Sequence, residues 1–320
     1  YTVVPTDGVL TVARRAATLA ANDKGRAYGG GNPTLLDATV TGGVAGGDAI
    51  QYTLATTATP LSGVGPYPIT VTLGVNPNYD VTPDHGVLMV LAAAATVKAN
   101  DKSKVYGNDN PALDATVTGQ VAGGSAITFT LSTTPTPLSG VGTIPITVTL
   151  GANPNYSVAA IPGALAITTR PAVVSANGKS KTYGDPNPTL DATVTGQVPG
   201  GAPVNYTLST TATALSGVAG SPYAITVAPG ANPNYSVTVT HGALTVGPKP
   251  ATLVVGHKTK VYGEENPELT GSTAGQVPGG DPIAFTLSTT AIRCSPVAGS
   301  PFAITATMGP NPNYTVTVFQ

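Results

Sequence analysis

The chain has 320 residues, including 39 Gly and 30 Pro, and it combines 41% hydrophobic residues with only 9% charged residues. Dense Gly and Pro exclude long helices, while the hydrophobic fraction is too high for a disordered chain. The formal net charge of −1 offers no basic surface for nucleic acid, and no stretch reaches the roughly 20 apolar residues of a membrane span. We therefore expect a turn-rich, all-β protein with no nucleic-acid partner and no membrane span in this segment.

Two motifs recur along the chain at intervals of 77 to 79 residues, which indicates copies of one structural unit. They are a Tyr-Gly pair and an Asn-Pro-Asn-Tyr turn. The period predicts four β modules, at residues 14–92, 93–170, 171–248 and 249–320. The repeat anchors are the tyrosines of the two motifs: Tyr28, Tyr106, Tyr183 and Tyr262 for the first, and Tyr79, Tyr156, Tyr235 and Tyr314 for the second. Since a scaffold position should repeat its packing, we expect the four Tyr-Gly tyrosines to be mostly buried.

The first predicted element in the chain belongs to none of these modules. A Gly-Xaa-Leu-Xaa-Val or Ile pattern follows the Asn-Pro-Asn-Tyr turn in the first three repeats and predicts their closing strand. Tyr1 stands in the place of the turn tyrosine, so residues 1–13 are predicted to be closing strands of a preceding module. The same spacing leaves the fourth module without its last strand. The predicted strand consists of Gly8, Val9, Leu10, Thr11 and Val12.

An incomplete sandwich exposes unpaired backbone groups that a matching strand can fill. Two explanations stay open: the sequence is a window on a longer continuous chain, or identical subunits exchange this strand head to tail in a fibre. In both cases the partners are further copies of the same module. We expect a strand equivalent to Gly8–Val12 to occupy the groove of the fourth module.

Alternating apolar and polar residues predict short strands within each module. In the second module Leu113, Ala115 and Val117 share one face. The pattern predicts a linear array of four small Ig-like antiparallel β-sandwich modules with very short joins. In that second module the strands are expected at residues 95–98, 113–118, 127–132, 146–150, 156–160 and 163–168.

The segment Tyr183–Gly201 reads YGDPNPTLDATVTGQVPGG, and Lys179-Ser180-Lys181 precedes it. Together with the Asn-Pro-Asn-Tyr turn and the closing strand, this pattern resembles the MBG-type tandem repeats of large bacterial adhesin-like surface proteins. All four repeats carry it, although the fourth departs at Gly271–Ala274. The resemblance implies a bacterial extracellular or cell-surface location and a stalk or filament role.

Most aromatic residues fall in positions that recur between repeats, which favours packing over a sugar-binding platform. Basic pairs two residues apart precede each Tyr-Gly. We interpret them as charges that discourage strand-edge pairing, against the alternative of a Lys-to-Asp or Lys-to-Asn crosslink, because the neighbouring aspartates should be exposed. The pairs are Lys24/Arg26, Lys102/Lys104, Lys179/Lys181 and Lys258/Lys260, and the aspartates are Asp37, Asp114 and Asp191.

No residue pattern predicts a catalytic, cofactor or metal site. The acidic turns that follow Tyr-Gly are interpreted as Asx turns rather than calcium sites, because calcium needs several oxygen ligands and the first repeat has no acid there. His85, His241 and His257 lie far apart, and Cys294 is a lone thiol. Asn-Xaa-Ser/Thr sequons occur at Asn155, Asn205, Asn234 and Asn313.

The leading functional hypothesis is therefore a structural repeat region of a bacterial extracellular fibre, filament or adhesin stalk, without enzyme activity or cofactor. The alternative is an adhesin module that recognises a glycan or protein through loops such as Thr133–Gly142. Near-identical Leu-Ser-Gly-Val loops in three repeats favour the structural role, because a binding array should vary its loops.

Overall fold

Short apolar and Thr-rich stretches, broken by Gly and Pro turns, form strands along nearly the whole chain. The computed structural model describes residues 1–320 and contains 26 strands and two single-turn 3-10 helices, Val218–Gly220 and Val297–Gly299. No helix in it has the length and hydrophobicity to cross a membrane. The prediction of an all-β fold with four repeated sandwich modules is confirmed.

The chain divides into two compact units. Unit 1 comprises Tyr1–Lys104, Asp109–Pro137 and Gly142–Ile167, and unit 2 comprises Val105–Asn108, Leu138–Val141 and Thr168–Gln320. The division runs through the second module, two of whose loop segments belong to unit 2.

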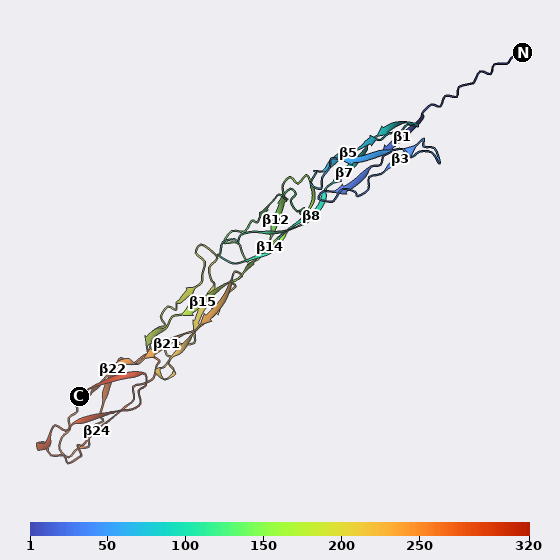
Figure 1. The fold of residues 1–320 in the computed structure, drawn as a ribbon. Coiled ribbons are helices and arrows are strands. Elements are labelled where there is room, and N and C mark those ends of the chain that lie inside the picture. Colours follow the sequence, from blue (N-terminus) through green and yellow to red (C-terminus); the bar gives the residue numbers. More distant parts are fainter. The chain divides into compact units, whose positions relative to one another are not determined.

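Module 1 shows the plan of the repeat (Figure 1): one sheet of three strands faces one of four. The three-stranded sheet has the order β3 (Ala38–Thr41), β1 (Arg15–Ala21) and β6 (Tyr79–Asp84). The four-stranded sheet has the order β2 (Lys24–Ala27), β7 (Gly86–Leu91), β5 (Gly65–Leu73) and β4 (Tyr52–Thr56).

Module 2 repeats this arrangement strand for strand. Its three-stranded sheet runs β10 (Ala115–Thr118), β8 (Ala93–Ala99) and β13 (Tyr156–Ile161). Its four-stranded sheet runs β11 (Phe129–Ser132), β12 (Gly142–Leu150), β14 (Gly163–Thr168) and β9 (Lys102–Val105).

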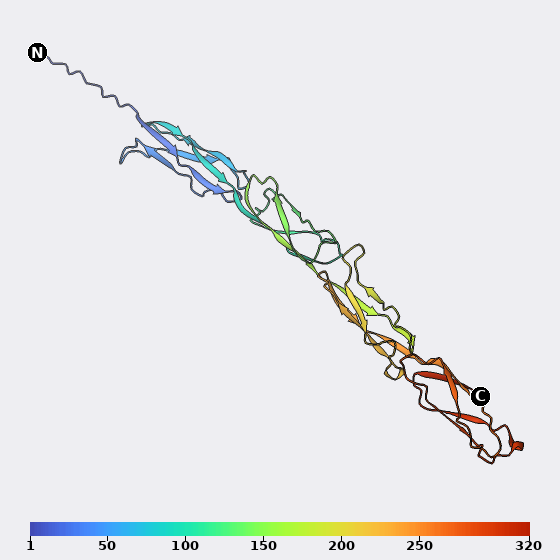
Figure 2. The ribbon, with the colours of Figure 1, turned by 180° about the vertical axis from the view of Figure 1, so that it is seen from behind.

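Module 3, in unit 2, has the same two sheets, and Figure 2 shows its strands from behind. The smaller sheet runs β17 (Ala192–Thr195), β15 (Arg170–Ala176) and β20 (Tyr235–Thr240). The larger sheet runs β16 (Lys179–Thr182), β21 (Gly242–Gly247), β19 (Tyr223–Pro229) and β18 (Tyr206–Thr210).

The sheets are mixed rather than wholly antiparallel. In modules 1 and 3 the first strand pairs in parallel with the strand after the Asn-Pro-Asn-Tyr turn, and the short basic strand pairs in parallel with the closing strand. The intervening chain crosses from one sheet to the other, which parallel partners require. Alternation of side chains does not reveal strand direction, so the sequence pattern alone predicted an antiparallel sandwich.

The closing strand lies inside the four-stranded sheet and supplies the centre of each core. Its leucine is fully buried in all three complete modules, at Leu88, Leu165 and Leu244. Full burial of such a side chain contributes about 1.5 to 3 kcal/mol. The closing strand is then followed, after a single residue, by the first strand of the next module; these residues are Ala92, Thr169 and Pro248.

Module 4 contains only part of this plan. Its first sheet is complete, with β23 (Gly271–Ala274), β22 (Lys249–Val255) and β26 (Tyr314–Phe319), so the unusual sequence of β23 still forms a strand. The second sheet has only β24 (Phe285–Thr289) and β25 (Ile304–Met308). Residues 258–260 form no strand, because the partner of their counterparts is the closing strand.

Residues 1–14 form no strand, and Figure 1 shows this segment extending away from module 1. Val9, Leu10 and Val12 are exposed to 93%, 90% and 86%. The predicted strand Gly8–Val12 is thus not used by module 1, whose four-stranded sheet already contains β7.

The basic pairs have two different roles. The first lysine of three pairs forms an ion pair with the aspartate predicted to be exposed, at 2.8 Å for Lys24–Asp37 and Lys102–Asp114 and 2.7 Å for Lys179–Asp191. These aspartate side chains keep 46% to 59% of their exposure, which does not provide the buried acid that a crosslink needs. The second member instead bonds a loop carbonyl: Lys104 Nζ donates to Thr136 O at 2.7 Å.

We expect the Lys102–Asp114 pair to make stability depend on pH. Hydrogen bonds from Lys102 and then Asn100 lower the pKa of Asp114 from its ordinary value of 3.8, because they favour the carboxylate. A lowered pKa in the folded state gives stability that is present above 3.8 and is lost as the pH falls through the folded value. An NMR titration should therefore give an Asp114 midpoint below 3.8, and Lys102→Gln should raise it. An unchanged midpoint in Lys102→Gln would contradict this assignment.

Candidate functional site

The tyrosines of the two repeat motifs meet where one module joins the next. Tyr28 contacts Tyr156 edge to face within unit 1, with ring centroids 5.4 Å apart and an interplanar angle of 83°. The same pair recurs twice within unit 2, as Tyr106–Tyr235 at 5.4 Å and Tyr183–Tyr314 at 5.5 Å. Such pairs contribute about 0.5 to 1.5 kcal/mol beyond their buried area. We call each of these three contacts a junction.

Three of the four Tyr-Gly phenols also accept a backbone hydrogen bond from the following module. Tyr28 Oη accepts from the Ser125 N–H at 2.9 Å, Tyr106 Oη from Ala202 at 3.0 Å, and Tyr183 Oη from Asp281 at 3.0 Å. The three rings are only 4%, 1% and 2% exposed. A buried hydroxyl without a partner is costly, so these bonds make the burial possible.

The partner tyrosine holds the same turn from inside its own module. Tyr156 Oη donates to Ser125 O at 2.8 Å and accepts from the Val121 N–H at 3.2 Å. The phenols of Tyr28 and Tyr156, which belong to neighbouring modules, therefore both form hydrogen bonds with the turn that contains Ser125. At Tyr28 the Ser125 hydroxyl and then its backbone N–H lower the phenol pKa from its ordinary value, because they favour the phenolate.

The glycine after each tyrosine allows the backbones to approach closely. Gly29, Gly107 and Gly184 have φ angles of 82°, 89° and 87°, a region that favours glycine. A Cβ at any of them would lie 2.5 Å from a valine methyl of the following module. The valines are Val121, Val198 and Val277.

Asparagine adds a third contact that the sequence analysis missed. In the Asn-Pro-Asn-Tyr turn the second Asn accepts a hydrogen bond from the Leu-Ser-Gly-Val loop of the preceding module. The Val64 N–H donates to Asn155 Oδ1 at 3.0 Å, Val141 to Asn234 at 3.0 Å, and Val218 to Asn313 at 2.7 Å. Three of the four sequon asparagines therefore lie in junctions. The recurrence of both motifs was the available signal, but their pairing needs the fold.

Charged side chains complete the Tyr106 junction. Arg170 Nε donates to Gly196 O at 3.1 Å, and its Nη1 donates to Asn108 Oδ1 at 3.2 Å. At the next junction Lys249 pairs with Asp185 at 3.5 Å. Exposed pairs of this kind contribute at most about 1 kcal/mol. They add to junctions that the tyrosines and backbone groups define.

The prediction that all four Tyr-Gly tyrosines are mostly buried is wrong for Tyr262, which is 63% exposed. The physical reason is that the other three side chains are buried by the following module and not by their own, and residues 1–320 include no further module to cover Tyr262. Tyr79, the first tyrosine of the Asn-Pro-Asn-Tyr set, is 5% exposed and accepts a hydrogen bond from the Val44 N–H of its own module. Its burial therefore does not depend on a Tyr-Gly tyrosine from another module.

The other singled-out residues have local structural contacts. Turn asparagines such as Asn110 donate to loop carbonyls, and His85 and His241 each accept from a backbone N–H at 3.1 Å. Tyr223 donates to Gly217 O at 2.9 Å. Cys294 is an exposed free thiol, and no group of three or more His, Cys, Asp or Glu gathers as a metal site. At each junction the phenol, asparagine amide and backbone groups form hydrogen bonds with one another.

Removing one junction hydroxyl should weaken the array. We expect Tyr183→Phe to lower the free energy of unfolding by about 1 to 3 kcal/mol, because the Asp281 N–H loses its partner. Tyr262→Phe is the matched control, since this ring is largely exposed, and it should change the value by less than about 0.5 kcal/mol. Chemical denaturation followed by circular dichroism measures both. Equal effects of the two substitutions would contradict the assigned role.

Comparison with known proteins places the repeats in one family. The MBG domain (YGX type) family matches residues 17–89, 95–166, 172–245 and 251–320. A search of curated proteins finds no match. Among solved structures, the crystal structure of the I9-I11 tandem from titin is similar, with 10% sequence identity, a TM-score of 0.21, and coverage of 72% of this chain and 98% of that chain. Because the family match covers most of the chain in four consecutive copies, this protein belongs to the MBG domain (YGX type) family.

Proposed function

We propose that this chain is a structural repeat region of a bacterial extracellular fibre, filament or adhesin stalk, and that it supplies length and stiffness at the cell surface. One observation carries the proposal: the same phenol, glycine and asparagine contacts are built at all three junctions. Recurrent contacts of this kind restrict the angle between neighbouring modules. MBG repeats occur in large surface proteins, which agrees with this role and location.

The loops that could bind a ligand already form hydrogen bonds at the junctions. Within Thr133–Gly142, the Val141 N–H donates to Asn234 Oδ1, and the equivalent groups of Val64 and Val218 do the same elsewhere. Groups that bond the next module are not free to bind a glycan or a protein. The near identity of these loops follows from their shared contact, which supports a structural role.

The proposal predicts that a single methyl group can loosen a junction. We expect Gly184→Ala to increase motion between modules 3 and 4, because the new Cβ would meet Val277 Cγ2 at 2.5 Å. Gly263→Ala is the matched control: its φ of 89° imposes the same backbone strain, but nothing lies within 4 Å of its Cβ. Small-angle X-ray scattering of the full chain should show greater flexibility only in Gly184→Ala.

Two results would count against the proposal. Scattering profiles that do not distinguish Gly184→Ala from Gly263→Ala would show that the close approach does not control the junction. Saturable binding of a defined glycan, abolished by substitutions within Thr133–Pro137 that leave the junction intact, would favour an adhesin module.

A further inference from the structure

Tension along the chain enters and leaves a complete module through its first and last strands. In module 3, β15 begins after the single residue Thr169 and leads through Asn177 and Gly178 into β16. Only Pro248 separates the closing strand β21 from β22. Because there is so little linker to extend, a pull acts directly on the β15–β16 segment from its N-terminal end and on β21 from its C-terminal end.

These strands run from one junction to the next. Arg170, the first residue of β15, is paired with Tyr235, whose ring contacts Tyr106 of the preceding module. Tyr183 directly follows β16, and its ring contacts Tyr314 of the following module. A pull between the two junctions is therefore directed along the strands and not across them.

Strand direction decides what such a pull does to the hydrogen bonds. β16 and β21 are parallel, with four consecutive pairs from Lys179–Leu244 to Thr182–Gly247. The Tyr183 N–H adds a bond to Gly247 O at 2.9 Å. Since parallel strands have their N-terminal ends side by side, pulling one by its N-terminus and the other by its C-terminus slides them past each other. All bonds of the ladder are then loaded together, whereas bonds pulled across the strands break one after another.

The closing strand is also held along its other edge. β19 pairs antiparallel with its first three residues, and beyond that pairing the Val246 N–H donates to Ser221 Oγ at 2.8 Å. The side chains of Leu244 and Val246 are 0% and 2% exposed. Sliding this strand would therefore break backbone bonds on both edges and withdraw two buried side chains from the core.

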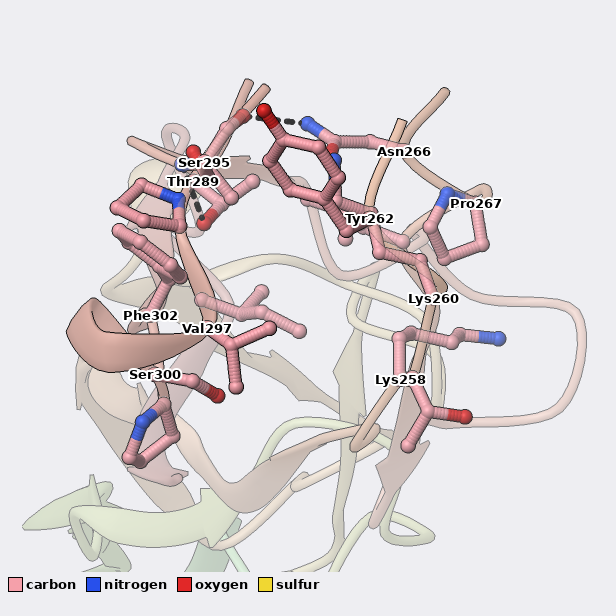
Figure 3. A pocket seen from close by; sticks show the side chains of 16 residues that line it. Lys258, Lys260, Tyr262, Asn266, Pro267, Thr289, Ser295, Val297, Ser300 and Phe302 are labelled. Atoms are coloured by element: carbon pink, nitrogen blue, oxygen red, sulfur yellow. Dashed lines mark hydrogen bonds between the residues drawn. The ribbon is translucent and has the colours of Figure 1, made fainter. Parts of the chain in front are cut away.

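Module 4 shows the space that a closing strand occupies. None of residues 1–320 forms that strand there, and a cavity of about 280 Å³ lies between Lys258 and Lys260 on one side and Phe302 on the other (Figure 3). Lys258 and Phe302 are the counterparts of Lys179 and Tyr223, which are both paired with Leu244 in module 3. Within the larger sheet of module 3 the closing strand alone joins β16 to β19.

A side-chain hydrogen bond fastens the start of this strand pair in modules 1 and 2. The residue before the basic strand is Asp23 in module 1, and its Oδ1 accepts from the Val87 N–H of the closing strand at 2.7 Å. In module 2, Asp101 Oδ1 accepts from the Ala164 N–H at 2.8 Å. Module 3 has Gly178 at this position and so offers a natural comparison.

We propose that each complete module bears tension along the array, and that the parallel pair of its basic strand and closing strand sets the force at which the module unfolds. Strands β2 and β7 of module 1 are paired in parallel in the same way, so this is a property of the repeat. Resistance to tension is a function beyond the proposed length and stiffness, because a stiff array can still consist of modules that unfold at low force.

Pulling module 3 in two directions tests the proposal. In the full chain with Cys294→Ser, handles on Thr169→Cys and Pro248→Cys load the module between its ends, whereas handles on Gly178→Cys and Thr240→Cys pull β16 and β21 apart near the point where both begin. Forced unfolding is governed by the unfolding rate constant, so with optical tweezers we expect the first geometry to need at least about twice the force of the second at the same loading rate. An equal or lower force between the module ends would overturn the proposal.

Two substitutions test the ladder without a change of pulling direction. Gly178→Asp copies the contact of Asp23 and Asp101 into module 3, and Gly178→Ala is the matched control, whose Cβ meets only Ala243 O at an ordinary 3.6 Å. With handles at residues 169 and 248, Gly178→Asp should unfold at the higher force, because the added bond is loaded together with the others. Equal forces for the two variants would contradict the proposal, and neither failure would affect the scattering test of the junctions.

Discussion

The structure depends on one constraint: a buried tyrosine hydroxyl needs a hydrogen-bond partner. At Tyr28, Tyr106 and Tyr183 that partner is a backbone N–H of the following module. The ring is therefore not buried by its own module alone, and Tyr262 shows the consequence, since it is largely exposed in residues 1–320, which include no further module. Burial of the phenol, the edge-to-face contact and the close approach at glycine all arise from the same pairing of neighbours.

Because each junction joins one module to the next, the stability of the chain should depend on contacts within modules and between neighbouring modules. Each complete module closes its own core with a leucine of its last strand and then passes, after one residue, into the first strand of its neighbour. Stability should thus be a sum of module terms and junction terms. Tyr262 and Val44, whose counterparts lie in junctions, are exposed and take part in no junction within residues 1–320.

Much of the fold could be predicted from the sequence, because the period, the turn residues and the alternation all give the same division into strands. Strand Gly163–Thr168, for example, was predicted with its observed bounds. Strand direction was not predictable, since alternation places side chains on faces and says nothing of which strand is the neighbour. The site was predicted only as two sets of recurring tyrosines. Tyr28 packs on Tyr156, and Asn155 accepts a hydrogen bond from the Val64 N–H. Both contacts join residues of neighbouring modules that lie far apart in the sequence, so they depend on the fold.

Amide hydrogen exchange tests the central claim most directly, namely that each phenol binds the turn of the following module. The backbone N–H groups of Ser125, Ala202 and Asp281 each donate to a phenol oxygen. Asp48 holds the matching position in module 1, where no Tyr-Gly tyrosine of residues 1–320 precedes it. The account predicts slow exchange at the first three amides and fast exchange at Asp48. Exchange at Ser125, Ala202 and Asp281 as fast as at Asp48 would contradict it.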